Sequence, residues 1–205
     1  MSKVQVDTID TRSGTSTMQI GSTNTTTINL GVSGDTINIP SGVTIANAGT
    51  ATGFGGANTP AWAVTMNGNQ SGLSQNAHTL VEMDTELLDT DNAYTNTASN
   101  YKFTVPSGKA GTYVIGALLY CNTQTVSQFR VQIYKNGSRI GRMNVNDSSN
   151  PDYPSAMINI VDVASAGDYY QCYCYHNQSG GITLYGGDGT NAIHTHGFFG
   201  YRLIS

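Results

Sequence analysis

The sequence predicts an all-β protein with two parts, a repetitive β-rich shaft followed by a globular head. Three observations lead to this prediction: polar and apolar residues alternate over short segments, turn-forming residues recur between these segments, and no stretch has the period of an amphipathic helix. Of the 205 residues, 24 are glycine and only 11% are charged, a composition that does not supply long solvent-facing helices. The length allows one ordinary domain and an appendage.

Residues 1–12 form a short amphipathic segment with more charge than residues 13–59, in which Asp35 is the only charged residue. We interpret this segment as a docking tip. A frayed terminus is the alternative, because chain ends are often disordered. The residues expected to dock are Val4, Val6, Asp7, Ile9 and Arg12.

Residues 13–50 are predicted to form a β-shaft, because apolar residues occur there in pairs with one polar residue between them, which places both on one strand face. Equivalent positions of successive pairs are eight or nine residues apart, with turn-forming residues between them. Two apolar side chains per strand bury too little surface to offset the chain entropy, so identical copies must wind around a common axis. We predict an obligate homotrimer; a flexible tether is the alternative. The expected shaft core consists of Ile20, Ile28, Leu30, Ile37, Ile39, Val43 and Ile45.

A glycine-rich neck at residues 51–60 precedes the head, which is expected to occupy residues 61–205. The head contains about ten candidate strands, enough for a sandwich or jelly roll. Asn136-Gly137 between two of them is the strongest short hairpin signal. The expected strands cover residues 61–66, 79–83, 101–105, 111–120, 129–134, 139–143, 155–163, 168–175, 182–185 and 197–204.

The tyrosine-rich segment 168–175 has two different faces. We expect one face to pack inside the head and the other to line the axis of the trimer. Cys172 and Cys174 are poorly placed to form a disulfide with each other, so these residues and Cys121 are expected to be buried reduced thiols. The two faces comprise Tyr169, Tyr173 and Tyr175 on one side, and Tyr170, Cys172 and Cys174 on the other.

Charge and hydropathy exclude several classes of partner. A net charge of -4 with nine Lys and Arg residues gives no basic footprint, so no nucleic acid is expected to bind. The amino terminus lacks the apolar core of a secretory signal, and no apolar run reaches membrane-spanning length. We therefore expect that the chain is synthesised in the cytosol and does not insert into a membrane. The absence of paired C-x-x-C elements argues against structural zinc.

The densest charge cluster lies at residues 82–91, which contain five carboxylates. These could hold Ca²⁺, but the spacing of an EF-hand is absent, and a solvated strand edge that discourages aggregation is the favoured interpretation. His194 and His196 share a strand face and are expected to pack at an interface; a metal or pH-responsive ring across three chains is the alternative. No nucleophile elbow is present, and we expect no enzyme activity, no metal and no cofactor.

Aromatic and amide side chains in two predicted loops are candidates for binding a receptor. A ring stacks on a sugar face and amides bind its hydroxyls, so these residues are compatible with a carbohydrate site. Ordinary polar loops are the alternative, because Asn is favoured in turns. The candidate receptor-binding residues are Tyr94, Asn92, Asn96, Asn146 and Tyr153.

Four motifs of the head, taken in order, resemble a known family. They begin with Tyr101-x-Phe103-x-Val105-Pro106 and continue with Tyr134-Lys-Asn-Gly137, Ala166-Gly-Asp168 and a final His196-Gly-Phe-Phe-Gly-Tyr-Arg-Leu-Ile204. Together they are similar to the globular head of complement-type and tumour-necrosis-factor-like proteins. The resemblance covers residues 61–205 and implies a ten-strand jelly roll that trimerises through aromatic-rich inner faces and follows a fibrous stalk.

Glycine does not recur at every third position, so the stalk is not collagen. A β-rich shaft with such a head is similar instead to fibre and appendage proteins of tailed bacteriophages, and residues 3–9 resemble the particle-attachment ends of marine phage fibres. This implies a homotrimeric short tail fibre of the virion, assembled in the host cytoplasm. It would contact other virion proteins through its amino terminus and a host surface glycan or protein through its head.

Two other functions remain open. A trimer that decorates or cements the capsid also suits a short chain with a docking end and a knob. Its copy number would be hundreds per particle, against a few or a few dozen for a tail fibre. A depolymerase is the third possibility and would release oligosaccharide from a host polysaccharide, although no motif supports it.

Overall fold

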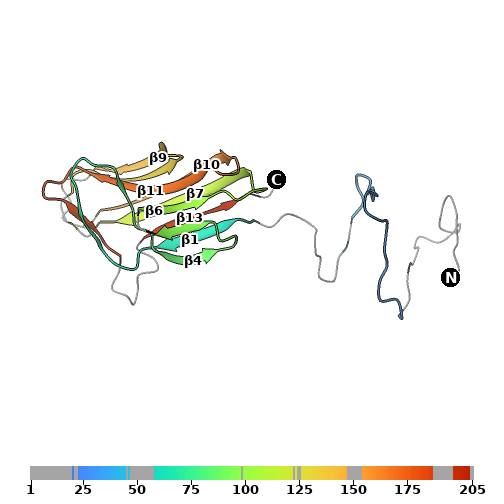
Figure 1. The fold of residues 1–205 in the computed structure, drawn as a ribbon. Coiled ribbons are helices and arrows are strands. Elements are labelled where there is room, and N and C mark those ends of the chain that lie inside the picture. The colour runs from blue at the N-terminus through green and yellow to red at the C-terminus, as the bar shows by residue number, and fades with distance from the viewer. Residues whose placement is uncertain are drawn as a thin grey trace. The chain divides into compact units, whose positions relative to one another are not determined.

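The computed structural model divides into two compact units, residues 1–51 and 52–205. It describes residues 20, 23–44 and 46 of the first unit, and residues 58–97, 99–121, 123, 126–146, 154–186 and 196–203 of the second. The expected docking segment, Ile45 of the shaft, Tyr153 and His194 lie outside the described residues. Figure 1 shows the strands of the second unit, the head, arranged in layers.

Five antiparallel strands form the first sheet of the head, in the order β10-β7-β13-β1-β4. Its interior strand β7 shows why the sequence forms this element: every second side chain from Tyr113 to Leu119 is buried, and Gly116 is flanked on both sides by neighbouring strands. The strands are β1 (Ala61–Thr65), β4 (Thr85–Asp89), β7 (Gly111–Tyr120), β10 (Ser155–Ala164) and β13 (Gly197–Arg202).

The second sheet has the order β5-β6-β11-β8-β9, and β3 pairs with β11 beyond the end of β6. The predicted hairpin at Asn136-Gly137 is confirmed: it connects β8 and β9, and both residues have the positive φ angles that this turn requires. The strands are β3 (Thr79–Leu80), β5 (Tyr94–Thr97), β6 (Asn100–Thr104), β8 (Phe129–Lys135), β9 (Ser138–Val145) and β11 (Tyr169–His176). A third, two-stranded sheet pairs β2 (Gln70–Leu73) with β12 (Ile182–Leu184).

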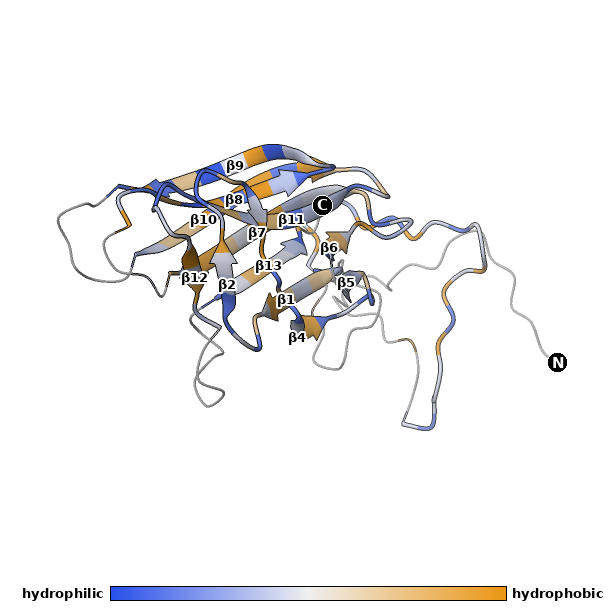
Figure 2. Ribbon diagram, turned by 60° about the vertical axis from the view of Figure 1, so that its left-hand side comes forward, coloured by the Kyte–Doolittle hydropathy of each residue, from blue (hydrophilic) through white to orange (hydrophobic). Residues whose placement is uncertain are grey.

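The core lies between the two large sheets. Hydrophobic and hydrophilic residues alternate along the strands of the head in Figure 2, which is the pattern of sheets with one buried face. The division of β11 into two different faces is confirmed, and the structure shows that Tyr170, Cys172 and Cys174 form the inner face, because all three are buried. The three cysteines are free and buried, and burial raises their thiol pKa values. Within the described residues, no helix is long and apolar enough to cross a membrane.

The two ends of the head are set by its topology. The end where β1 begins, called the neck end here, also carries the end of β13, since the Arg202 amide donates to the Pro60 carbonyl. The turn at 165–168 and the Asn136-Gly137 hairpin belong to the same end, because the Asn136 amide donates to the Tyr169 carbonyl. At the opposite, far end, Phe129 at the start of β8 pairs with His176 at the end of β11.

The described shaft residues contain two turns, at 32–35 and 40–43, where the sequence has turn-forming residues between its apolar pairs. In each, the amide of the fourth residue donates to the carbonyl of the first, and Gly34 and Gly42 take positive φ angles of 97° and 84°. Between these turns the described single chain forms no β-ladder. The apolar residues of the expected shaft core that are described are all exposed, from 44% for Ile39 to 62% for Leu30.

Candidate binding surface on the outer face of the second sheet

The structure does not gather the candidate receptor-binding residues into one site. Tyr94 was expected as an exposed loop ring, and this is wrong: it lies in β5, is 7% exposed, and its hydroxyl donates to the Met83 carbonyl. Burial raises its pKa above the ordinary value. The ring is therefore part of the core, because its hydroxyl finds a partner inside the head.

The three candidate amides are exposed but dispersed. Asn92 lies at the neck end, two residues after Thr90, whose amide donates to the Ala61 carbonyl. Asn96 lies along β5 and Asn146 follows β9 at the far end, where it accepts a hydrogen bond from Asn144. Tyr153 is outside the described residues. Asn92 and Asn146 at opposite ends cannot contact one small ligand.

The acidic stretch 82–91 includes β4, which forms one edge of the first sheet. Its carboxylates mainly hold the chain: Asp89 accepts from the Asp91 and Tyr94 amides, and Asp84 accepts from the Asn67 amide. Among the residues that the structure describes, no group of three His, Cys, Asp or Glu side chains is placed to hold a metal ion. His196 is buried inside the head, where its Nδ1 accepts from the Tyr120 amide at 3.4 Å.

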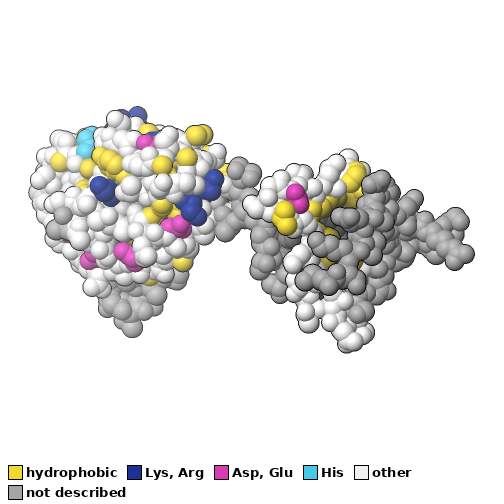
Figure 3. Space-filling model, turned by 45° about the vertical axis from the view of Figure 1, so that its right-hand side comes forward, with side chains coloured by type: hydrophobic (Ala, Val, Ile, Leu, Met, Phe, Trp, Pro, Cys, Tyr) yellow, Lys and Arg dark blue, Asp and Glu magenta, His cyan; other side chains and the backbone are white. Residues whose placement is uncertain are grey.

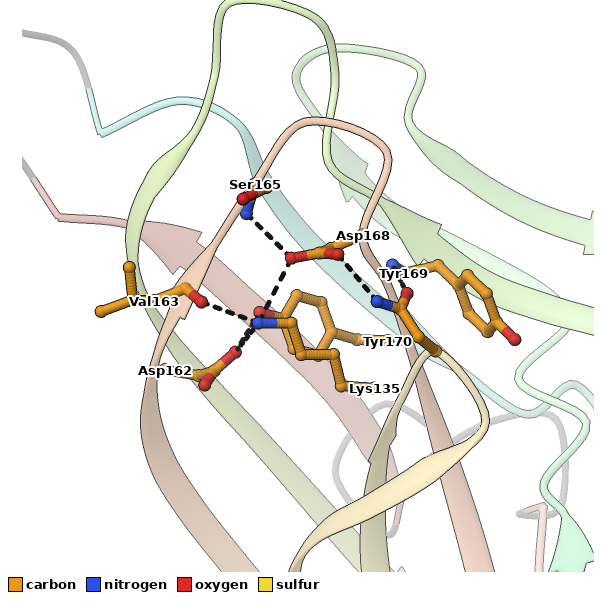
Figure 4. Close-up of polar contacts among 8 residues, drawn as sticks. Lys135, Asp162, Val163, Ser165, Asp168, Tyr169 and Tyr170 are labelled. Atoms are coloured by element: carbon orange, nitrogen blue, oxygen red, sulfur yellow. Dashed lines mark hydrogen bonds and ion pairs between the residues drawn. The ribbon is translucent and has the colours of Figure 1, made fainter.

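A polar cluster at the neck end ties together the β8–β9 hairpin and the β10–β11 turn (Figure 4). The Lys135 ammonium contacts a carboxylate oxygen of Asp162 at 2.8 Å and one of Asp168 at 3.2 Å, and donates to the Val163 carbonyl at 2.7 Å. The Tyr170 hydroxyl donates to the same Asp162 oxygen. Hydrogen bonds to these two carboxylates raise the pKa of Lys135 against the opposing effect of burial, so the amine stays charged and acts as a tie rather than a nucleophile.

Aromatic side chains cover the outer face of the second sheet, the face turned away from the core. The rings of Tyr134 and Tyr173 are 4.2 Å apart, and those of His78 and Tyr175 are 5.1 Å apart. These three tyrosines and Tyr169 are half-buried, so part of each ring reaches solvent. We call this set the tyrosine face; it consists of His78, Tyr134, Tyr169, Tyr173 and Tyr175.

Strand alternation and register explain why these residues gather. In β11 the buried residues Tyr170, Cys172 and Cys174 force their neighbours onto the outer face. Tyr173 pairs with Gln132 on β8 and with Leu80 on β3, so β3, far away in sequence, brings His78 to the same face. The His78 Nδ1 and the Gln132 side-chain oxygen are 2.8 Å apart, which fixes the ring.

A pocket of about 270 Å³ adjoins the tyrosine face where β3 meets the edge of β6. Gln70 closes one side of the pocket, and its side chain is held by two hydrogen bonds. The side-chain nitrogen donates to the Leu80 carbonyl at 3.0 Å, and the side-chain oxygen accepts from the backbone amide of Glu82 at 3.1 Å. The pocket thus offers a phenol ring, a carboxylate, hydroxyls and an amide. Its lining residues are Gln70, Thr79, Leu80, Glu82, Ser99 and Tyr101.

The sequence identified part of this surface but not its extent. The alternation in 168–175 predicted two different faces of β11, one of them expected at the trimer axis and neither as a binding surface. The pocket was missed because it joins residues from β2, β3 and β6. Figure 3 shows one face of the head, on which hydrophobic side chains reach the surface among polar atoms and several Lys and Arg side chains.

Comparison with known proteins shows the fold and one distant relative. The chain is similar to murine APRIL, at 12% identity and a TM-score of 0.51 over 70% of this chain and 98% of that chain, and to the globular domain of zebrafish complement 1qA protein, at 13% identity and a TM-score of 0.47 over 71% and 98%. The head therefore has the jelly-roll fold seen in murine APRIL, which agrees with the jelly roll that the sequence resemblance implies.

In sequence, the chain is similar to protein XkdV of the phage-like element PBSX from Bacillus subtilis strain 168, with 32% identity over 92 residues. The match covers 41% of this chain and only 13% of that protein. No protein-family model matches the chain. The relative supports a phage origin.

Proposed function

We propose that the protein is a homotrimeric virion appendage, a short tail fibre. It attaches to its particle through residues 1–12 and binds a host surface glycan through the outer face of its head. The observation that carries this proposal is the tyrosine face beside a polar pocket of about 270 Å³. Its mode of action is non-covalent adhesion.

The chemistry of this surface suits a sugar. Sugar rings present C–H groups that pack on aromatic faces, which the half-buried rings of Tyr134 and Tyr173 offer. Their hydroxyls need donors and acceptors fixed in place, and Glu82, Thr79 and Ser99 line the pocket that would receive one sugar unit. A concave site with a few convergent polar groups is typical of small-ligand binding.

The first sheet supplies the trimer interface in this proposal. Its outward side carries exposed apolar residues on β10, with Val161 at 67%, Val163 at 72% and Met157 at 49% exposure in the single chain. In the register of the sheet, Val161 pairs with Val114, which pairs with Tyr201, so apolar side chains continue across three strands. Such a continuous patch marks an interface. We therefore assign the trimer axis to this sheet rather than to the outer face of β11, which stays free for ligand.

The shaft supports the same stoichiometry. Its exposed isoleucines would be covered only by further copies of the chain. Three heads on one shaft present three tyrosine faces, and weak binding at each adds to a much stronger attachment through effective concentration. The relative XkdV belongs to a phage-like element, which supports a place in a phage particle.

Binding of the intact protein to a glycan array and to whole bacterial cells tests this proposal. The double variant Tyr134→Ala with Tyr173→Ala is expected to lose binding while its sedimentation mass stays unchanged. Tyr185→Ala, which removes a half-buried tyrosine outside the tyrosine face, is the matched control and should bind as the wild type does. Equal binding by the double variant would show that another surface holds the receptor.

A further inference from the structure

The basic side chains of the head are divided into two groups. Lys109 and Lys135 form ion pairs with carboxylates, at 3.4 Å to Asp91 and at 2.8 Å to Asp162. Five others form no ion pair among the described residues: Lys102, Arg130, Arg139, Arg142 and Arg202. Arg202 lies on β13 of the first sheet, whereas the other four lie on strands of the second sheet, so most of the described cations without a carboxylate partner are concentrated on one layer of the head.

Register places these cations beside the aromatic residues. Arg142 pairs with Gln132, which pairs with Tyr173, and Tyr173 pairs with Leu80 at the pocket. This row crosses four strands, about 14 Å from Arg142 to Leu80 at the usual strand spacing. Arg139 pairs with Tyr134 one row nearer the neck end.

Two of the cations rest on rings of the tyrosine face. The Arg130 guanidinium lies 4.3 Å from the centre of the Tyr175 ring, and the Lys102 ammonium lies 4.9 Å from that of Tyr169. These contacts hold the charge at the surface without neutralising it. Arg130 is fixed further because its Nε donates to the Asn144 side chain at 2.9 Å.

Acidic residues are absent from the strands that form this surface. β8, β9 and β11 contain no Asp or Glu, although the whole chain carries a net charge of -4. The local charge therefore has the opposite sign to the net charge of the protein. Arginine is suited to this position because its planar guanidinium binds carboxylate, sulfate or phosphate oxygens with two parallel hydrogen bonds.

We propose that the ligand of the tyrosine face is an acidic polysaccharide, whose carboxylate, sulfate or phosphate groups pair with Arg130, Arg139 and Arg142 while its sugar rings stack on Tyr134 and Tyr173. This inference rests on the proposed function and specifies its ligand. Glu82 in the adjacent pocket repels an anion, so the pocket takes a neutral sugar unit of the same chain. The ligand thus carries neutral units between its acid groups.

A single-stranded nucleic acid also combines phosphates with stacking rings. It carries a charge on every nucleotide, and the net charge of -4 and the carboxylate at the pocket oppose such a dense polyanion. A polysaccharide with spaced charges avoids both penalties. The surface therefore favours the polysaccharide.

Matched polymers test this inference with the intact protein. The probes are dextran, carboxymethyl-dextran, dextran sulfate and a single-stranded DNA of similar length, and binding is measured at low and at high salt. We expect both charged dextrans to bind more tightly than dextran, by about tenfold or more at low salt, with the difference shrinking as salt rises. Arg139→Gln combined with Arg142→Gln should remove this difference, because both side chains are exposed and their loss leaves the fold intact. Lys109→Gln, at the neck end, should leave it unchanged.

The unfavourable outcomes are distinct. Equal binding of neutral and charged dextrans through Tyr134 and Tyr173 would overturn the acidic ligand and leave glycan adhesion standing. DNA binding as tight as that of dextran sulfate, and lost in the arginine variant, would overturn the polysaccharide. If no polymer binds, the acidic-ligand inference fails, while the glycan array tests adhesion separately.

Discussion

Trp62 of β1 and Phe103 of β6 stack face to face between the two large sheets, with ring centres 3.7 Å apart and ring planes 5° from parallel. Both residues are fully buried, and Phe198 meets Trp62 edge-on at 5.7 Å. The contact joins the first and second sheets at the middle of the core. On the neighbouring strand β13, Gly200 pairs with Trp62, and the indole ring leaves no room for a side chain there. A β-carbon at Gly200 would lie 2.3 Å from the ring.

Gly200→Ala is therefore expected to destabilise the head by about 1–3 kcal/mol, because the added methyl group displaces Trp62 from its stack. Urea unfolding followed by tryptophan fluorescence measures this, and Trp62 is the only tryptophan. Gly197→Ala in the same strand is the control, since no atom lies within 4 Å of its β-carbon position. Equal effects of the two substitutions would contradict the packing described.

Lys135→Met is expected to destabilise the head by about 1–2 kcal/mol, because it leaves Asp162 and Asp168 facing each other without their shared cation. Hydrogen bonds from the Asn136 side chain and the Ser165 amide lower the pKa of Asp168 most, and the contact with Lys135 lowers it further. Its contribution to stability is thus present above the carboxyl pKa of an unfolded chain and lost as the pH falls through the lower folded value. The variant should show a weaker pH dependence in that acid range, and an unchanged melting temperature would remove the structural role of the cluster.

Acid should destabilise the head through His196. Burial lowers its pKa to about 4 from an ordinary value of 6.5. The unfolded chain binds a proton at this histidine at higher pH than the folded chain does. The full stability is therefore present above pH 6.5, and roughly 3 kcal/mol of the free energy of unfolding is lost as the pH falls toward 4. Burial also lowers the pKa of His176, so His196→Gln should reduce the slope without abolishing it. An identical slope in wild type and variant would place the acid sensitivity elsewhere.

The shaft should resist protease only as an assembly. Limited proteolysis of the intact protein is expected to spare residues 13–50, because their exposed isoleucines would be covered by the neighbouring copies. Ile37→Asn combined with Ile39→Asn removes one apolar pair and should open this segment to cleavage. Rapid cutting of the wild type across the segment would instead support a flexible tether.

Parts of the fold were readable from the sequence because the signal is local. β7 forms at Gly111–Tyr120, the same residues that its dense apolar run predicts, and the Asn136-Gly137 hairpin follows from turn chemistry. β4 was not predicted, since Leu87-Leu88 between acidic residues breaks the alternation, and it forms as an exposed edge strand by pairing with β1. β5 was likewise missed, and with it the burial of Tyr94.

The candidate site was harder to predict from the sequence, because its geometry depends on the register between strands that are far apart in the chain. Tyr173 meets Leu80 only because β3 pairs with β11, and Arg142 reaches the same row through the β8–β9 hairpin. Alternation in β11 showed that two tyrosine sets exist, but it could not show which layer each one faces. The exposed loop amides were predicted as a site from residue type alone, and the topology separates them.

The proposed threefold assembly is the basis of both the shaft and the multivalent head in this account, and the mass of the intact protein in solution tests it most directly. Sedimentation equilibrium at micromolar concentration should give three times the 21.7 kDa of one chain, about 65 kDa. Val161→Glu, which places a charge on the apolar side of the first sheet, should lower this mass, whereas Met143→Glu on β9 should not. A wild-type protein that sediments as a single 21.7 kDa species would contradict the trimer.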